Sequence, residues 1–176
     1  MCSYQPAPAI KTDRLTLRAP RAEDASRIAA LCGDFEIPRM TTRMPWPYRL
    51  EDAQGFVGRM ANANPDQDKV FMVEHPADGA IGAVGFHTHE RHPELGDWLG
   101  RPYWGKGYAT EAVRAALAWT RDGWKRKVVA AGHFADNPAS GGVLIKSGFL
   151  YTGDVLPKHS VARGQDVPTR MMVWLA

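Results

Sequence analysis

The sequence predicts a single domain of the α/β (α+β) class, built on one mixed, twisted β-sheet flanked by about four helices. Two observations support this class. Segments that alternate as strands do and segments with the 3.6-residue period of helices interleave along the 176 residues. In addition, a chain of this length that is 44% hydrophobic and 23% charged has the composition of a folded domain with a sizeable core. We expect an N-terminal tail over residues 1–11 and the domain over residues 12–176.

The first part of the domain is predicted to hold one strand and two helices. Residues 12–19 alternate in polarity and predict a strand, which Pro20 stops. Residues 23–32 and 51–61 carry apolar stripes at helical spacing. The intervening residues 35–50 contain three prolines among large apolar side chains, so we expect irregular structure there.

The second part alternates strands with two further helices. The cleanest helical stripe predicts a helix over residues 109–121. Asn137 followed by Pro138 is a strong helix start, because asparagine caps the helix and proline has no N–H to leave unpaired. That helix should end near Gly148. The predicted strands are residues 69–74, 80–87, 94–100, 128–133, 149–153 and 167–175.

Composition disfavours several classes of protein. No run of about 18 apolar residues spans a bilayer, and the first residues lack the basic-then-apolar pattern of a secretory signal, so we expect a cytoplasmic protein with no membrane partner. The net charge of +3 is mild, and basic residues alternate with acidic ones, which disfavours a nucleic-acid partner. Cys2 and Cys32 are expected to be reduced thiols.

A glycine-containing loop from Tyr103 to Thr110 joins a predicted strand to the cleanest predicted helix. Gly105 and Gly107 allow the backbone to turn sharply and to approach a ligand closely. The helix that follows presents unpaired N–H groups and the positive end of its dipole, and Lys106 adds a cation. The loop therefore predicts a phosphate or pyrophosphate site, although a plain tight turn is the simpler alternative.

Two other phosphate motifs fit this loop less well. Residues 100–106 match the first seven positions of a nucleoside-triphosphate loop, but Gly107 stands where Ser or Thr must hold magnesium. A dinucleotide fingerprint needs Gly or Ala where Thr110 stands, and it belongs near the first strand of its unit.

Three segments together resemble the GNAT superfamily of N-acetyltransferases. Residues 94–112 resemble its acetyl-coenzyme A motif, and they are closest to the branch of ribosomal-protein N-terminal (alanine/serine) acetyltransferases. Residues 12–18 resemble the first strand of that branch. Residues 137–140, followed by residues 146–149, resemble its last helix and the turn after it. The segments occur in the family's order and the resemblance covers almost the whole chain.

The resemblance implies a sheet that is splayed between two central parallel strands, here residues 94–100 and 128–133, with acetyl-coenzyme A as co-substrate. Pantetheine would lie in the splay and pair with the backbone of Trp98, Leu99 and Gly100. Asn137 and Ser140 would face the thioester. The pyrophosphate would rest on the amides of Trp104, Gly105, Lys106, Gly107, Tyr108, Ala109 and Thr110.

Glu94 and Asp97 are the candidate general bases, with Ser140 as a third catalytic candidate. The odd spacing of the two carboxylates places them on opposite faces of their strand, so one of them can meet the substrate directly. We favour Glu94 slightly; a surface carboxylate is the alternative for each. The family's tyrosine that protonates the departing thiolate is replaced by Leu144. The resemblance therefore leaves three alternatives for the departing thiolate: protonation by Ser140, protonation by water, or departure without a proton donor.

Two further features have open interpretations. His87, His89 and His92 form a spaced cluster at a strand end, but no cysteine or carboxylate set completes it, so we expect no metal site. Residues 35–50 are a candidate lid on the acceptor side; a satellite hydrophobic cluster or a dimer contact is the alternative.

The expected function is direct transfer of acetyl from acetyl-coenzyme A to a primary amine. By resemblance, the first-choice acceptor is the α-amino group of a protein or peptide. The alternatives are a small amine, an antibiotic, or no turnover at all in a sensor that binds acyl-coenzyme A. Dimers are common in the resembled branch, so a homodimer is a further expectation.

Overall fold

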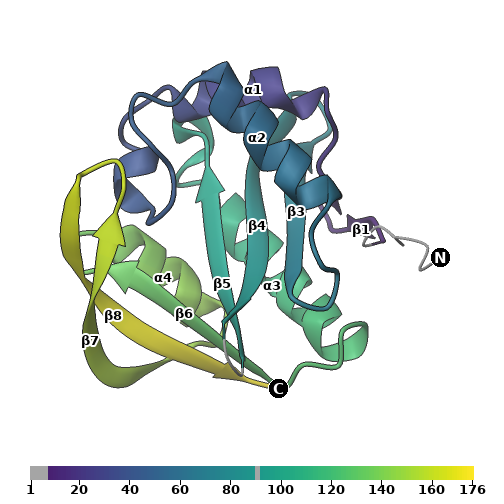
Figure 1. The fold of residues 1–176 in the computed structure, drawn as a ribbon. Helices are drawn as coiled ribbons and strands as arrows, with labels where there is room; N and C mark the ends of the chain where they lie inside the picture. Colours follow the sequence, from purple (N-terminus) through teal and green to yellow (C-terminus); the bar gives the residue numbers. More distant parts are fainter. Residues whose placement is uncertain (1–7, 90–91) are drawn as a thin grey trace.

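The computed structural model describes residues 8–89 and 92–176, apart from the side chain of His89. Eight strands form one sheet in the order β1-β2-β3-β4-β5-β6-β8-β7 (Figure 1). The strands are β1 (Ile10–Lys11), β2 (Thr16–Arg18), β3 (Asp68–His75), β4 (Gly79–His89), β5 (His92–Leu99), β6 (Val128–Phe134), β7 (Leu150–Ser160) and β8 (Gln165–Leu175).

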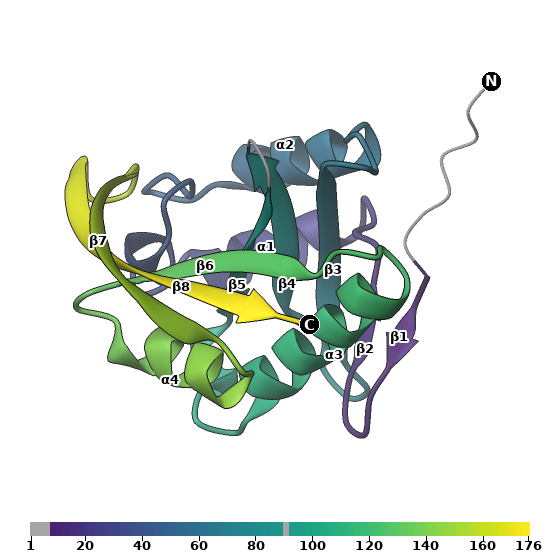
Figure 2. The ribbon, with the colours of Figure 1, turned by 90° about the horizontal axis from the view of Figure 1, so that it is seen from below.

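Helices cover both faces of the sheet. α1 (Asp24–Cys32) and α2 (Leu50–Ala61) lie on one face, and α3 (Tyr108–Asp122) and α4 (Pro138–Lys146) lie on the other (Figure 2). Each face has its own apolar cluster because successive strand residues point to opposite sides. In β3, Phe71 and Val73 are buried with α3, whereas Met72 is buried with α1 and α2.

The neighbouring strands run antiparallel except for the central pair, β5 and β6. This parallel pair is short: Glu94 lies opposite Ala130 and Leu95 lies opposite Ala131, and no pairing follows. The two strands therefore separate after Leu95, which confirms the predicted splay between two central parallel strands.

The helices were predicted to within about two residues, but two strands were not. Residues 12–15 form a turn, closed by a 2.9 Å hydrogen bond from the Thr12 N–H to the Leu15 carbonyl, so the predicted strand over residues 12–19 is wrong in its first half. Residues 10–11, which we placed in the tail, instead form β1 and pair with β2.

β7 extends to Ser160, well beyond the predicted end at residue 153. Gly153 has φ +95° and lies in a bulge rather than in a closing turn. Pro157 is tolerated farther along because β7 is the edge strand and one side of its backbone has no neighbour. The edge strand can therefore continue into a long hairpin with β8.

Residues 35–49 are irregular as predicted, apart from a short 3₁₀ turn, η1 (Pro38–Met40), whereas Leu50, the last residue of the predicted irregular segment, begins α2. In the described part of the chain, no helix combines the length and the apolar character needed to cross a membrane.

Candidate active site

The loop before α3 adopts the conformation for which its glycines are needed. Gly105 and Gly107 have φ values of +73° and +79°, in the left-handed region where a Cβ is unfavourable. Gly107 directly precedes Tyr108, the first residue of α3. The N–H groups of the first helical turn have no partners within the helix, so the loop and helix together provide an anion site.

The N-terminus of α3 is held by the turn between β1 and β2. Glu111 accepts a 2.6 Å hydrogen bond from the Thr12 hydroxyl and a 2.7 Å ion-pair contact from Arg14 Nε. Partial burial opposes ionisation of Glu111, but the hydrogen bonds from Thr12 and Arg14 prevail and lower its pKa. Arg14 also donates to the Lys106 carbonyl at 2.9 Å. These contacts between residues 12–14 and the start of α3 were not predicted from the sequence, although residues 12–18 belonged to the resemblance.

An open pocket of about 530 Å³ adjoins the start of α3. Its size is within the usual range for small-molecule sites. Its lining residues come from the β1–β2 turn, the first two turns of α3 and the end of α4. They are Thr12, Asp13, Arg14, Gly107, Thr110, Glu111, Arg114 and Lys146. Three of these side chains are cationic and two, Asp13 and Glu111, are acidic. Glu111 is paired with Arg14, so Arg114 and Lys146 are the cations that an anionic ligand in this pocket would meet.

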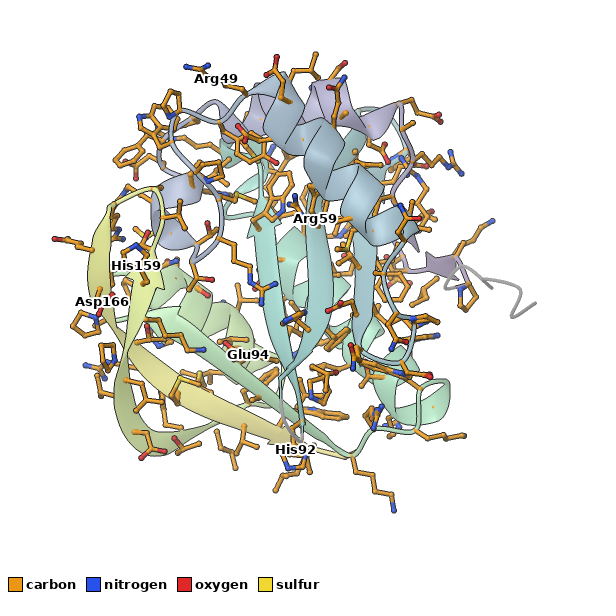
Figure 3. The ribbon with its side chains drawn as sticks, viewed as in Figure 1. Arg49, Arg59, His92, Glu94, His159 and Asp166 are labelled. Atoms are coloured by element: carbon orange, nitrogen blue, oxygen red, sulfur yellow. The ribbon has the colours of Figure 1, made fainter. Side chains whose placement is uncertain are left out.

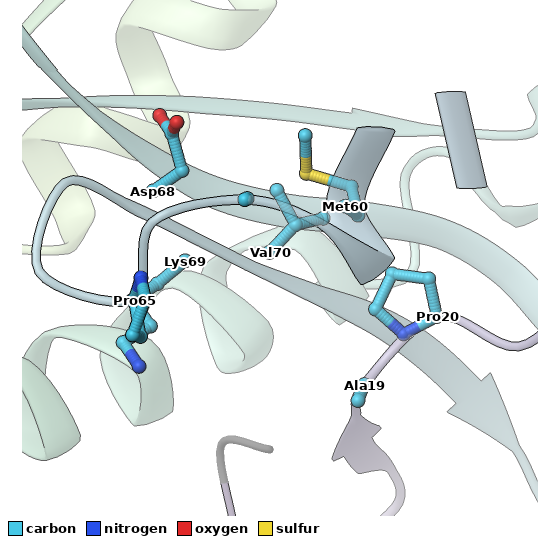
Figure 4. Close-up of a pocket in the computed structure, with 8 residues that line it drawn as sticks. Ala19, Pro20, Met60, Pro65, Asp68, Lys69 and Val70 are labelled. Carbon is cyan, nitrogen blue, oxygen red and sulfur yellow. The ribbon is translucent and has the colours of Figure 1, made fainter. Parts of the chain in front are cut away.

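A second cavity, of about 20 Å³, lies between the end of α2 and β3 (Figure 4). It has room for little more than a water molecule and cannot hold a coenzyme. Its lining residues are Ala19, Pro20, Met60, Ala63, Pro65, Asp68, Lys69 and Val70.

In the splay, alternate residues of β5 direct their backbone groups either to β4 or away from it. The Gly100 N–H donates to the Ile81 carbonyl at 2.8 Å, so the groups of Gly100 and, by alternation, Trp98 point to β4. Those of Asp97 and Leu99 therefore point toward the splay. The Leu99 carbonyl already accepts a 2.8 Å bond from the Trp104 indole. This differs from the expected trio, in which Trp98 and Gly100 also paired with the ligand.

Glu94 and Asp97 lie on opposite faces of β5, as predicted. Asp97 shares a face with Leu95 and Leu99, whose side chains lie in the cluster under α3 and α4. Within the described residues, the Asp97 side chain has no hydrogen-bond partner. The surrounding protein removes water from the carboxyl and raises the pKa of Asp97 to about 6.

The Glu94 side chain lies on the face of α1 and α2, the side from which Figure 3 is viewed. Its carboxylate is paired with the ammonium group of Lys158 on β7. The side chains of Glu94 and Lys158 are 33% and 24% exposed. The Glu94 carboxylate is therefore partly accessible to solvent, and its partner in this ion pair is the side-chain amine of Lys158.

Asn137 caps α4 as predicted, because its side-chain oxygen accepts a 3.3 Å hydrogen bond from the Ser140 N–H. Ser140 is half-buried in the first turn of that helix. Leu144 is 1% exposed and packs in the core, so position 144 places an inert side chain beside the sheet.

The segment over residues 35–49 is fastened to the β7–β8 hairpin, which curls toward it in Figure 1. The Val161 N–H donates to the Thr42 carbonyl, and the Ser160 hydroxyl donates to the Thr41 carbonyl, each at 3.1 Å. Trp46 stays 42% exposed and packs on Phe35 with ring centroids 4.9 Å apart. The segment therefore borders the Glu94 side of the splay without being fully buried.

The other sequence candidates have structural roles. His133 is buried, contacts Tyr151 at 2.9 Å and packs against Gly141. The pKa of Cys32 is raised to about 12 by burial. His87 pairs with Asp68, while Cys2 and the side chain of His89 lie outside the described residues. The described residues contain no cluster suited to a metal ion.

A mixed sheet that opens beside a glycine loop at a helix N-terminus is suited to a protein that binds a phosphate-bearing cofactor, and Glu94 lies on the opposite face of the same strand. The family described as "Acetyltransferase (GNAT) domain" matches residues 14–150. The chain therefore belongs to the GNAT acetyltransferase family. It is an N-acetyltransferase, and acetyl-coenzyme A is its co-substrate.

Known proteins support the family and the fold. An uncharacterized N-acetyltransferase, YoaA from Bacillus subtilis, is 25% identical over 169 residues, covering 93% of this chain and 94% of YoaA. A GNAT-family acetyltransferase structure from Bacillus anthracis has a TM-score of 0.82 and 23% identity, over 96% of this chain and 98% of its own. The ribosomal-protein-S5-alanine acetyltransferase structure from Vibrio fischeri has a TM-score of 0.82 and 17% identity, over 96% and 97%.

Proposed function

We propose that the protein transfers acetyl directly from acetyl-coenzyme A to a primary amine that approaches from the α1–α2 side of the sheet. The observation that carries this proposal is the division of β5 between two faces. Asp97 and Leu99 offer backbone groups to the coenzyme in the splay, while Glu94 opens toward the opposite face. Donor and acceptor can then meet where β5 and β6 separate, without a covalent enzyme intermediate.

The coenzyme would be held at two places. Its pyrophosphate would bind the amides from Trp104 to Thr110, where the positive φ of Gly105 and Gly107 keeps the backbone open. The adjoining pocket with Arg14, Arg114 and Lys146 would take the remaining phosphate-bearing part of the ligand. Asn137 and Ser140 at the start of α4 would lie at the thioester end.

Glu94 would act as the general base, because the acceptor amine must lose a proton before it can attack the thioester. Asp97 is the weaker candidate: it lies on the coenzyme side of the strand, with Leu95 and Leu99. Since Leu144 is buried in the core, Ser140 or water would protonate the departing thiolate. Positioning of the two reactants would supply much of the acceleration, up to about 7–11 kcal/mol in ideal cases.

The first-choice acceptor is the α-amino group of a protein or peptide. The structural neighbour from Vibrio fischeri is named as a ribosomal-protein-S5-alanine acetyltransferase, which supports a protein acceptor. Residues 35–49 and the β7–β8 hairpin are hydrogen-bonded to each other and border this side, which favours a flexible N-terminus over the surface of a folded domain. A small amine fits the same approach.

The test is release of free coenzyme A from acetyl-coenzyme A in the presence of an amine panel. The panel would contain peptides beginning with alanine or serine, the same peptides with blocked N-termini, a polyamine and an aminoglycoside. We expect turnover with the free peptides and none with the blocked ones. Turnover with only the polyamine or only the aminoglycoside would show that the acceptor is a small amine or an antibiotic rather than a peptide N-terminus. Coenzyme binding without turnover of any amine would instead support the alternative of a non-catalytic sensor that binds acyl-coenzyme A.

A further inference from the structure

Lys158 places an amine beside Glu94, the residue proposed above as the general base. Its ammonium group contacts the Glu94 carboxylate, although the two residues lie on β7 and β5, with β8 and β6 between them. The strong curl of the β6–β8–β7 half of the sheet closes this distance (Figure 1). Glu94 is also the penultimate residue of β5 to pair with β6 before the splay opens.

We propose that the protein acetylates its own Lys158, using Glu94 as the base and acetyl-coenzyme A as the donor. This inference rests on the proposed function, because it needs a thioester delivered to the start of the splay. It adds a covalent modification site, and an internal substrate, to an enzyme whose external acceptor is an amine of the same chemical class.

The step balances with the groups already present. Glu94 takes one proton from the Lys158 ammonium, which makes Nζ a neutral nucleophile. Nζ attacks the thioester carbonyl carbon, the C–S bond breaks, and an N–C amide bond forms. The second proton lost from nitrogen goes to coenzyme A as its thiol is formed, directly or through water. No oxidant, metal or further reactant is needed.

The product changes the site electrostatically. An acetylated Lys158 is neutral and can no longer form an ion pair with Glu94, so the carboxylate is released toward an incoming ammonium. Because the acetylated nitrogen is an amide and no longer a nucleophile, Lys158 would be acetylated once per chain.

The chain offers a control lysine. Lys125, which has φ +57°, is exposed beyond the end of α3, and among the described residues no carboxylate forms a salt bridge with it. Any uncatalysed acetylation in solution should modify Lys125 at the rate of an ordinary exposed amine. Lys158 is less exposed than Lys125, so faster labelling of Lys158 would reflect the site rather than accessibility.

The experiment incubates the full chain, with no acceptor, with acetyl-coenzyme A carrying a deuterated acetyl group. Peptide mass spectrometry then follows the label at Lys158 and at Lys125 over time. The isotope separates this reaction from acetylation acquired during expression. We expect Lys158 to be labelled on the order of 10²-fold faster than Lys125, the lower range of general-base effects.

Two variants identify the cause. Glu94→Gln should remove the excess rate at Lys158 and leave Lys125 unchanged. Asp166→Asn is the matched control, because it alters a carboxylate paired with His159 on the same hairpin, and it should leave the rate at Lys158 intact (Figure 3). Thermal unfolding with acetyl-coenzyme A establishes that each variant folds and binds the donor.

The outcomes separate the two proposals. If the protein binds acetyl-coenzyme A and acetylates an external amine, but Lys158 is labelled no faster than Lys125, self-acetylation is wrong and the proposed function stands. If Glu94→Gln labels Lys158 as fast as the parent does, the assigned role of Glu94 is wrong. If acetyl-coenzyme A neither shifts unfolding nor is consumed, both proposals fall.

Discussion

The guanidinium of Arg163 and the carboxylate of Asp136 are joined by two hydrogen bonds, of 2.7 and 3.2 Å. Arg163 belongs to the turn between β7 and β8, and Asp136 lies between β6 and α4. The same guanidinium donates to the Arg39 carbonyl at 2.6 Å. One side chain therefore ties together three segments at the border of the acceptor side.

The contacts of Arg163 with Asp136 and Arg39 predict that loss of Asp136 affects acceptor binding more than coenzyme binding. Asp136→Ala should raise the apparent KM for the acceptor several-fold, because it frees Arg163 and loosens its hold on residues 35–49. The free energy of unfolding should fall by about 1 kcal/mol, since Asp136 is partly exposed. Steady-state kinetics and coenzyme titration would measure this. Asp122→Ala, which breaks the exposed ion pair with Arg121, is the control. If Asp136→Ala weakened coenzyme binding as much as acceptor binding, the proposed role of the Arg163 contacts would be wrong.

Gly107→Ala should weaken acetyl-coenzyme A binding at least about tenfold, or about 1.4 kcal/mol. The substitution places a Cβ on a residue with φ +79° and 3.4 Å from an Arg14 guanidinium nitrogen. A left-handed conformation costs a non-glycine residue about 1–2 kcal/mol. In the free protein the loop can relax away from that conformation, so the cost falls on coenzyme binding, which must restore it.

Gly58→Ala provides the comparison for Gly107→Ala, because nothing lies within 4 Å of a Cβ added at Gly58 in α2. It should stabilise the protein by up to about 1 kcal/mol and leave the dissociation constant unchanged. Isothermal titration and thermal unfolding of both variants provide the readings. Unchanged affinity in Gly107→Ala would argue against a pyrophosphate site at the loop.

Asp97 predicts a pH-dependent stability. Burial raises its pKa from the ordinary value of 3.8 to about 6, so the native protein binds this proton more tightly than the unfolded chain does. Stability is therefore lost as pH rises between these two values, and the loss is complete above about pH 6. Asp97→Asn should be nearly neutral below pH 4 and stabilising by about 1–3 kcal/mol at pH 7.

Urea unfolding at several pH values would measure the effect of Asp97→Asn. Asp66→Asn, at an exposed position after α2, is the control and should show no such trend. A stabilisation by Asp97→Asn that is the same at pH 4 and pH 7 would exclude titration of Asp97 as the cause.

Trp46→Ala should raise the apparent KM for the acceptor while coenzyme affinity is unchanged. Trp46 is 42% exposed and packs on Phe35, in the segment that borders the acceptor side. Kinetics with each substrate varied in turn would separate the two effects. Leu175→Ala removes another exposed apolar side chain, at the end of β8, and serves as the control. Parallel loss of both affinities with a lowered Tm would indicate a folding defect instead.

The sequence by itself determined the class of fold, the four helices and the glycine loop. These features depend on local periodicity, on capping by Asn137 and on the need for glycine at positive φ, all of which are encoded within a few residues. The opposite faces of Glu94 and Asp97 also followed from strand alternation alone.

Only the tertiary structure decided which residues from distant segments meet. The Arg14 contact with Glu111, the Lys158 contact with Glu94 and the Arg163 contact with Asp136 join positions separated by 97, 64 and 27 residues. Local sequence patterns predict individual strands, but they do not predict how closely two strands that are not neighbours in the sheet approach each other. The length and curl of β7 depend on its place at the sheet edge, where Pro157 and the bulge at Gly153 are tolerated.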